Sequence, residues 1–424
     1  MFLLYNLILT LLSPIWVPWM IWRSKKRQES PNWQERQGIY NSIPKKEKGE
    51  KRIWVHAVSL GEMIAVKPFL QELKQQNPEV KIILSTTTSS GHQSAREKLT
   101  EWFDYLVYFP IDLPRFQLLA MQRVRPDVIA IMETELWFNF LWAADVFNAP
   151  AYIVNGRNSD RAFKNSQKVK WFYKAMFKYL KGCLVQTQAD AERFSYLGAQ
   201  GVCVLGNVKF DEAASIIKST TDWKKELHIP LNHRVVVIGS TRSEYEVELT
   251  QRAIIPILTE NPHLTVIHAP RHIEAAEEVM SAMKSLLPPN SSISCGFRSK
   301  NDMATYLVLD SYGELAGVYN IADIVVIGGG FDKLGGQNLI QPLALGKPVI
   351  HGPNMFNFRD IATTSVSAGA SMVSNTSLEL QHSIESLLSD ETQRETMSQR
   401  ASELVQKNLG ASKRYAEAVL AELD

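Results

Sequence analysis

The sequence predicts an α/β protein with two parallel, doubly wound sheets, each in its own domain, preceded by an apolar N-terminal segment. The chain has 424 residues, a length typical of two domains of about 150–200 residues each. Short β-branched runs alternate with amphipathic segments along most of the chain, which is the pattern of parallel strands connected by helices. A composition with 45% hydrophobic and 21% charged residues is that of a folded globular protein.

The N-terminal segment is the sharpest local feature. Residues 1–22 contain no charged side chain, and a basic run follows at 23–27. About 20 apolar residues suffice to span a bilayer as a helix, and the basic flank places the following chain on the cytoplasmic side. Pro14 and Pro18 also permit a segment that lies in the membrane interface. We therefore expect a membrane anchor at 1–22, spanning or interfacial, that holds the protein on the cytoplasmic face of a membrane.

The strand candidates fall into two series. Those in the first half are residues 53–58, 81–86, 105–109, 128–132, 151–154, 182–186 and 202–205. Those in the second half are residues 234–239, 264–268, 306–309, 324–327, 348–350 and 370–373. A polar stretch separates the series, so we expect domains at 23–215 and 216–424. Ligands of such sheets bind at the carboxyl ends of the strands, here in a cleft between the two domains.

Local charge is more informative than the net charge of +2. Residues 157–181 hold eight Lys or Arg against one Asp, interleaved with aromatic side chains. This segment is either a core helix with a solvated basic face or a surface helix that contacts anionic lipid. Its basic residues match no readout motif, so we expect no nucleic-acid partner. The three cysteines show no spacing typical of a disulfide framework or a zinc site.

Loops at expected strand ends of the first domain carry candidate catalytic side chains. Glu62 stands at the start of a helix after a tight turn, either as a complement to the helix dipole or as a general base. Glu133 and Glu135 directly follow an apolar strand. On a strand they would share a face, and such close like charges raise one pKa. Lys209, just past another strand, is either functional or solvated surface.

The second domain has loops rich in glycine and hydroxyl groups at its expected strand ends. They cover residues 237–246, 267–278, 310–323 and 328–352. Ser240 and Thr241, with the amides of a helix start, are suited to hold a phosphate, and Arg271 and His272 add charge and a hydrogen bond. Residues 328–336 include five glycines in nine positions. The absence of Walker A and G-x-G-x-x-G loops argues against ATP hydrolysis and hydride transfer, and the loops together predict a nucleotide site.

The order of these motifs resembles the 3-deoxy-D-manno-octulosonic acid (Kdo) transferases of lipopolysaccharide synthesis over essentially the whole chain. The matching motifs are Ser59-Leu60-Gly61-Glu62, Met132-Glu133-Thr134-Glu135-Leu136-Trp137, Gly206-Asn207-Val208-Lys209-Phe210-Asp211, Pro270-Arg271-His272, Gly313-Glu314-Leu315, Gly335-Gly336-Gln337-Asn338, and Gly352-Pro353 with Asn357-Phe358. The resemblance implies a membrane-anchored GT-B glycosyltransferase with two Rossmann-like domains that face each other across a cleft. The N-terminal domain binds the acceptor, and the C-terminal domain binds CMP-Kdo. The resemblance further implies inverting transfer to a phosphorylated lipid A precursor, without metal or other cofactor.

The resemblance also implies roles for single residues. Glu62 matches the family's catalytic base, and Glu133 and Lys209 match positions that stabilise the transition state. The family's CMP contacts correspond to Pro270, Arg271, Tyr312, Gly313, Glu314, Asn338, Leu339, Ile340 and Gln341.

The chain departs from the family's pattern in places. Where the family usually has Thr-His-x-Gly-Glu-Glu, this chain reads Thr241-Arg242-Ser243-Glu244-Tyr245-Glu246. Gln337 replaces a usual His, and Gln341 replaces a usual Glu at the ribose position. The alternatives are a transferase with an altered donor or acceptor, or a catalytically silent relative that binds lipid A precursor or a partner enzyme. A sugar-nucleotide epimerase of this fold would not need the anchor.

Overall fold

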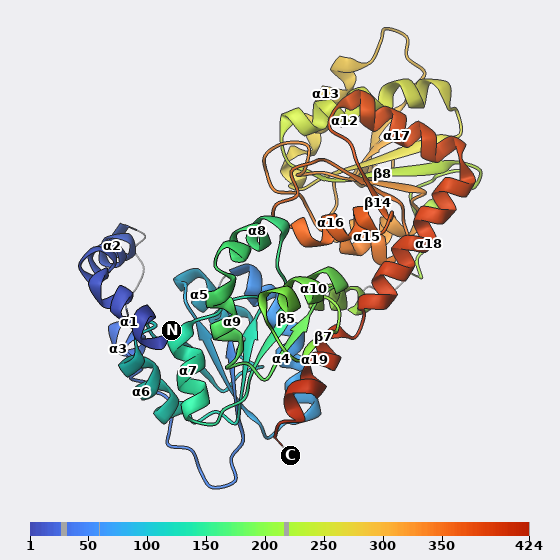
Figure 1. The fold of residues 1–424 in the computed structure, drawn as a ribbon. Coiled ribbons are helices and arrows are strands. Elements are labelled where there is room, and N and C mark those ends of the chain that lie inside the picture. Colours follow the sequence, from blue (N-terminus) through green and yellow to red (C-terminus); the bar gives the residue numbers. More distant parts are fainter. Residues whose placement is uncertain (27–31, 59, 216–219, 424) are drawn as a thin grey trace. The chain divides into compact units, whose positions relative to one another are not determined.

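The computed structural model describes residues 1–26, 32–58, 60–215 and 220–423 (Figure 1). The chain divides into two compact units, Met1–Asp211 with Asn408–Asp424, and Glu212–Lys407. The first boundary lies close to the expected one at 215/216. The expected second domain, however, ran to the end of the chain, whereas residues 408–424 belong to the first unit.

The first unit contains a seven-stranded sheet of order β3-β2-β1-β4-β5-β6-β7 whose strands pair in parallel. Its strands are β1 (Arg52–His56), β2 (Lys81–Thr86), β3 (Tyr105–Tyr108), β4 (Val128–Met132), β5 (Ala151–Gly156), β6 (Gly182–Val185) and β7 (Val202–Val204). Each predicted strand of the first half is therefore confirmed.

The second unit contains another seven-stranded parallel sheet, of order β10-β11-β9-β8-β12-β13-β14. Its strands are β8 (Arg234–Thr241), β9 (Leu264–Pro270), β10 (Cys295–Phe297), β11 (Tyr306–Val308), β12 (Ile324–Ile327), β13 (Val349–His351) and β14 (Ser371–Val373). The sequence predicted six of these strands and missed β10, a three-residue edge strand that pairs with β11.

Helices connect the strands and cover the sheets (Figure 1). Those of the first unit are α1 (Phe2–Leu11), α2 (Ser13–Lys26), α3 (Trp33–Arg36), α4 (Leu60–Gln76), α5 (Ser89–Lys98), α6 (Pro114–Val124), α7 (Phe138–Val146), α8 (Asp160–Lys168), α9 (Lys170–Phe177), α10 (Gln188–Leu197) and α19 (Ala411–Leu420). The others are α11 (Trp223–Glu226), α12 (Glu244–Glu260), α13 (Ala276–Leu286), α14 (Leu315–Val318), α15 (Ile340–Ala344), α16 (Arg359–Ser367), α17 (Ser377–Ser389) and α18 (Glu391–Asn408). The short 3₁₀ segments are η1 (Val208–Ser215), η2 (Ile273–Ala275), η3 (Arg298–Lys300) and η4 (Tyr319–Ile321).

The first unit's sheet is buried on both faces, as a parallel sheet between helices must be. Successive residues of β1 show this, because Ile53 and Val55 belong to one hydrophobic cluster and Trp54 to another. The first cluster also contains Tyr415 and Val419 of α19, which packs against α4. This apolar face explains why the last residues return to the first unit and are not part of the second.

The N-terminal segment forms two helices. Within the described residues, no single helix is long and apolar enough to cross a membrane, whereas α1 and the start of α2 qualify by length and composition as a pair bent by 63°. Helix α1 is docked on the first unit: the ring centroids of Phe2 and Trp142 lie 4.4 Å apart, and the Tyr5 hydroxyl donates to Asp112 at 2.8 Å.

Candidate active site

Both sheets are parallel, so the loops that follow their strands meet at one edge of each unit. In the first unit this edge carries Glu133, directly after β4, and Arg157, directly after the neighbouring β5. The Glu133 carboxylate accepts a hydrogen bond from Arg157 Nε at 2.7 Å, and its side chain is only 10% exposed. The Thr134 hydroxyl donates to the Arg157 carbonyl at 3.1 Å, which ties the two loops together a second time. The sequence did not single out Arg157.

Glu133 has a backbone φ of 56°, a left-handed conformation that is uncommon for residues other than glycine. Its amide donates to the Val154 carbonyl at 2.9 Å, so the turn is fixed by the adjacent strand. Strained conformations of this kind are found preferentially at functional sites. Strand β4 ends at Met132, and Glu133 and Glu135 therefore directly follow the strand, as the sequence predicts, and do not share a face of it.

Glu135 is nevertheless perturbed in the expected direction. Burial, and after it the negative charge of Glu133, raises the pKa of the Glu135 carboxyl. The two carboxylates thus differ in environment, because Glu133 has a guanidinium partner. Such divergent neighbours are a recurring feature of acid and base sites.

Glu62 lies in the first turn of α4, as predicted; its side chain is outside the part of the chain that the structure describes. The strand before it ends in His56, which is fully buried and stacked on Phe109 with ring centroids 3.9 Å apart. Burial lowers the pKa of His56 to about 3, so this imidazole is neutral at physiological pH.

Lys209 lies in η1, and its amide donates to Asn207 Oδ1 at 3.0 Å. The residues around it anchor the returning C-terminal chain. The Asn207 amide donates to Asn408 Oδ1 at 2.9 Å, and the Asp211 carboxylate accepts from the amides of Gly410 and Ser412 at 2.6 and 2.7 Å. Asn207 and Asp211 therefore hold the loop of Lys209 against the start of α19, which packs on the helix of Glu62.

In the second unit, a pocket of about 310 Å³ lies at the carboxyl edge of the sheet. Of the predicted CMP contacts it brings together Pro270, Arg271, Tyr312 and Gly313, and Ser240 lines it as well. The Arg271 amide donates to the Thr241 carbonyl at 2.8 Å, and this bond connects the ends of β9 and β8. Pockets of this size are typical of small-molecule sites.

The neighbouring Glu314 has protein partners of its own. Its carboxylate oxygens lie 3.2 Å from Nε and Nη2 of Arg298, and the Ser311 hydroxyl also donates to it. Tyr312 is 80% exposed, and its hydroxyl donates to Glu274 at 3.1 Å. Glu314 therefore stabilises the loop of Tyr312 and Gly313 but does not itself line the pocket.

The remaining predicted contacts, residues 338–341, follow β12 at the same edge of the sheet. Within the described chain, the residues that line the 310 Å³ pocket do not include them. Leu339 and Ile340 have exposed fractions of 0% and 2%, so neither residue presents an accessible surface to a ligand in this structure. Asn338 Oδ1 accepts from the Ile340 amide at 2.8 Å, and Gln341 is half-buried in the first turn of α15.

The glycine-rich loop after β12, which the sequence assigns to a nucleotide site, uses several of its amides within the protein. The amides of Gly329 and Phe331 donate to the carboxylate of Glu246 at 2.8 and 2.9 Å, and Gly328 donates to Gly239. A Cβ on Gly328 would lie 2.6 Å from Thr241 Cα. The absence of a side chain there permits close packing of two loops.

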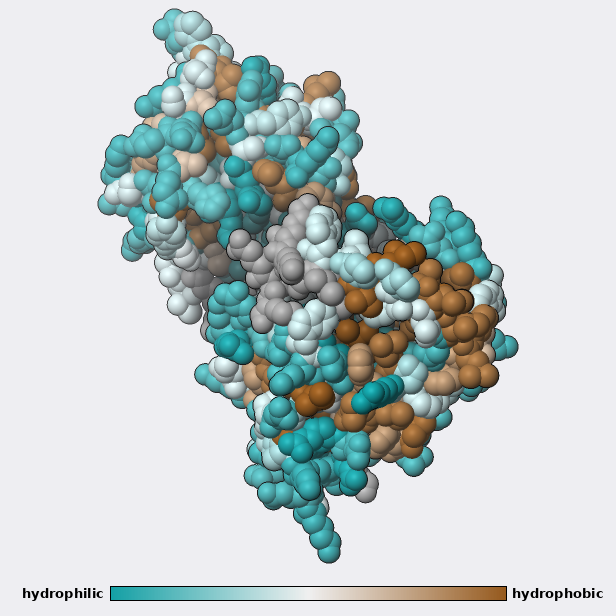
Figure 2. All heavy atoms as spheres, turned by 90° about the vertical axis from the view of Figure 1, so that its left-hand side faces the viewer, coloured by the Kyte–Doolittle hydropathy of each residue, from teal (hydrophilic) through white to brown (hydrophobic). Residues whose placement is uncertain are grey.

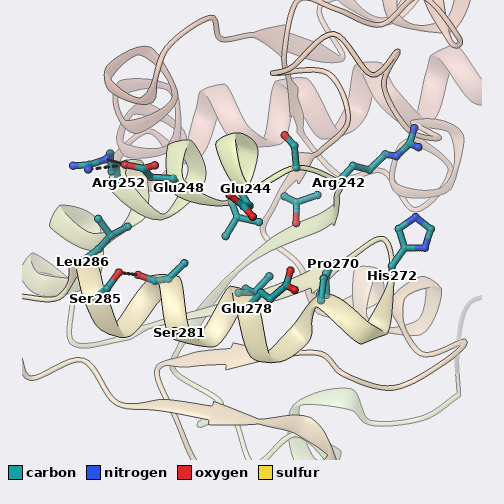
Figure 3. Close-up of a pocket in the computed structure, with 16 residues that line it drawn as sticks. Arg242, Glu244, Glu248, Arg252, Pro270, His272, Glu278, Ser281, Ser285 and Leu286 are labelled. Carbon is teal, nitrogen blue, oxygen red and sulfur yellow. Dashed lines mark hydrogen bonds and ion pairs between the residues drawn. The ribbon is translucent and has the colours of Figure 1, made fainter.

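A larger groove of about 790 Å³ runs between α12 and α13 (Figure 3). Arg242 and His272 lie at one end of it, and Arg252 and Leu286 lie at the other (Figure 3). Pro270 and His272 line both this groove and the smaller pocket. The groove is walled by the sides of two helices, whereas the smaller pocket is walled by strand-end loops.

Two doubly wound parallel sheets, each with its polar loops gathered at one edge, define the GT-B class of glycosyltransferase fold. MurG from Acinetobacter baumannii is a solved structure of similar fold, with a TM-score of 0.57 at 13% identity over 88% of this chain and 99% of that one.

The sequence comparisons identify the family within this class. The model of the family described as 3-deoxy-D-manno-octulosonic-acid transferase (kdotransferase) matches residues 31–212. The chain is 31% identical to the 3-deoxy-D-manno-octulosonic acid transferase of Haemophilus influenzae over 376 residues, 85% of each chain. It is 28% identical to that of Bordetella pertussis over 98% of each chain. The chain belongs to the Kdo transferase family and is a glycosyltransferase.

Proposed function

We propose that the protein transfers Kdo from CMP-Kdo to a phosphorylated lipid A precursor, lipid IVA, with inversion at the reacting sugar carbon. The first unit binds the acceptor and the second binds the donor. The observation that carries this proposal is the convergence of Pro270, Arg271, Tyr312 and Gly313, from two different loops, on one pocket at the carboxyl edge of the second sheet. These residues were assigned to CMP from sequence motifs alone.

In the second unit, Arg271 holds the phosphate of the donor. Its side chain is exposed at the pocket, and its backbone is fixed by the bond to Thr241. Negative charge grows on the leaving CMP phosphate during transfer. A guanidinium aimed at the developing charge stabilises the transition state.

In the first unit, Glu62 removes the proton from the acceptor hydroxyl, a step that a general base must perform within hydrogen-bond reach. Glu133 and Lys209 stabilise the transition state. The ion pair with Arg157 and the bond to Val154 support this role for Glu133, because they hold its carboxylate and backbone in one orientation. Such preorganisation is a condition of electrostatic catalysis.

The N-terminal helices bind the membrane interface in this proposal and keep both units on the cytoplasmic face of the inner membrane. One side of α1 packs on the first unit through Phe2 and Tyr5, while Leu3 and Leu11 on its other side are 82% and 68% exposed. Figure 2 displays a large hydrophobic area on the side of the molecule where α1 and α2 lie. The docked position of α1 favours an interfacial anchor over a spanning one.

The test is incubation of the protein with CMP-Kdo and a tetra-acylated, bisphosphorylated lipid A precursor in detergent, followed by mass spectrometry. We expect acceptor masses increased by one or more Kdo units. The Arg271→Ala variant is the matched control for donor binding and should require more CMP-Kdo for the same rate. An unchanged acceptor with the wild-type protein, or product formed only from another CMP-sugar, would contradict the proposed donor.

A further inference from the structure

Glu246, in the first turn of α12, is a charged residue with an exposed fraction of 0%. Its carboxylate is satisfied by backbone amides. One oxygen accepts from Arg242 at 3.1 Å and Gly329 at 2.8 Å, and the other accepts from Phe331 at 2.9 Å and Asp332 at 3.3 Å. Burial of a carboxylate is costly unless it is hydrogen-bonded in this way. Glu246 therefore depends on these backbone amides to remain buried as a charged group.

The amides belong to loops that are far apart in the sequence. Arg242 lies in the turn between β8 and α12, whereas Gly329, Phe331 and Asp332 lie in the loop after β12. Strands β8 and β12 are neighbours in the sheet, so one carboxylate fixes both loops at the sheet's carboxyl edge. Hydrogen bonds to an ionised acceptor are about twice as strong as neutral ones.

Gly329 is in turn connected to a later part of the same loop. The Gly336 amide donates to the Gly329 carbonyl at 2.6 Å, and Gln337 and Asn338 follow directly. Asn338 then accepts from the Ile340 amide at 2.8 Å, at the start of α15. Hydrogen bonds, together with the short stretch of backbone from Gly336 to Asn338, therefore connect Glu246 to the segment 338–341.

We propose that Glu246 is a positioning residue for the nucleotide: it does not contact the donor, but its carboxylate holds the loops after β8 and β12 in the conformation that binds CMP. The role deepens the proposed function and rests on it, because it assumes that CMP binds at this edge of the second unit. If the competent conformation of the loops becomes a minor one, the apparent affinity for CMP falls by the same fraction.

The test uses the full chain and the variant Glu246→Gln. Glutamine has nearly the same shape, but only its Oε1 accepts, so the amides held by the other oxygen lose their acceptor. We expect hydrogen exchange of the amides in 328–334 to accelerate at least tenfold, and calorimetric affinity for CMP to weaken by about tenfold or more. The KM for the acceptor should stay unchanged, which separates positioning of the donor from general damage to the enzyme.

Glu260→Gln is the matched control, because Glu260 is an exposed carboxylate at the other end of the same helix. It should leave both exchange and CMP affinity as in the wild type. Glu246→Asp keeps the charge on a shorter side chain and should give an intermediate affinity; it decides the question alone if the Gln variant does not fold.

The outcomes separate the two proposals. Wild-type protein that binds CMP, with variants whose affinity stays within twofold of it, would overturn the positioning role alone. Unchanged exchange in 328–334 would overturn it as well. Wild-type protein that does not bind CMP at all would instead contradict the proposed donor, and with it the role of Glu246.

Discussion

The Glu133 carboxylate and the Arg157 guanidinium, from the ends of neighbouring strands, form an ion pair with a distance of 2.7 Å between Oε2 and Nε. The pair matters for function only if the orientation of Glu133 matters. We predict that Arg157→Met lowers the rate of Kdo transfer about 10–100-fold, because small misplacements of a catalytic group have effects of this size.

Arg157→Lys should retain part of that rate, since it keeps the positive charge but lacks the planar donor group. Arg161→Met, at an exposed position in α8, is the control for loss of a positive charge. Turnover of Arg157→Met within twofold of the wild type, measured at saturating donor and acceptor, would show that the ion pair is only structural.

Glu62→Gln tests the proposed base. We expect a decrease in transfer rate of about 10²–10⁴-fold, the usual effect of losing a general base. Calorimetric affinity for CMP should be nearly unchanged, because Glu62 belongs to the first unit and the proposed CMP pocket to the second. A variant that keeps more than about a third of the wild-type turnover lies far outside this range and would exclude the role.

Much of the fold follows from sequence periodicity, because fully buried parallel strands such as β4 and β12 are continuous apolar runs. Strand β10 was missed since Cys295–Phe297 is short, contains Gly296 and pairs at the edge of the sheet. The sequence also did not predict that α19 packs on the first unit. Its apolar face requires a partner, and the pattern alone does not say which of two similar sheets supplies it.

The candidate site was predictable where chemistry is local and not where it depends on distant loops. Glu133 and Arg271 stand next to strands that the sequence identifies. Glu246 was not singled out from the loop 237–246, although its spacing to Thr250, Ala253 and Ile257, which are all buried, places it on the core face of α12. A carboxylate on that face needs buried hydrogen-bond donors. This position in the helical pattern is the sequence signal that identifies Glu246.

Asp112 provides a prediction of pH dependence. Its carboxylate accepts from Tyr5 and from the amides of Asn139 and Phe140, but burial dominates and raises its pKa from 3.8 to about 6. A raised pKa in the folded state adds stability that is fully present below about pH 4 and lost as the pH rises through about 6.

The variant Asp112→Asn has no titratable group at this position. The difference in unfolding free energy between wild type and variant therefore isolates the contribution of the Asp112 carboxyl. Relative to the variant, the free energy of unfolding of the wild type should fall by about 3 kcal/mol between pH 4 and pH 8, since each pKa unit corresponds to about 1.4 kcal/mol. Urea unfolding of both proteins across this range measures the difference. A difference that is constant with pH would mean that Asp112 has an ordinary pKa.

Deletion of residues 1–22 should leave a folded protein, since both sheets lie beyond this segment. It should nevertheless destabilise the first unit by about 2–4 kcal/mol, because the partly buried Phe2 and Tyr5 are lost from the aromatic cluster around Phe138 and large apolar side chains contribute about 1.5–3 kcal/mol each. Activity should fall mainly with acceptor presented in bilayers and less with acceptor in detergent.

Helix α1 supplies its own control for this deletion. Serine in place of the outward-facing Leu3, Leu7 and Leu11 should reduce flotation with vesicles that contain anionic lipid, while the unfolding midpoint stays close to that of the full chain. A truncated protein that does not fold would mean that α1 is an essential part of the core, and vesicle binding equal to wild type would contradict the anchor.

Gln341 is the last position to test, because the resemblance noted from the sequence implies a glutamate that binds the ribose at this position. A carboxylate there would accept charge-assisted hydrogen bonds from ribose hydroxyls, worth about 1.5–3 kcal/mol against about 1 kcal/mol for a neutral bond. Gln341→Glu should therefore bind CMP more tightly by about 1 kcal/mol, near fivefold. Thr392→Glu adds an exposed carboxylate to the first turn of α18 and controls for charge alone. Tighter binding only in Gln341→Glu, measured by calorimetry, would support a ribose site that has lost a charge, whereas weaker binding would mean that the neighbours of Gln341 have adapted to the amide.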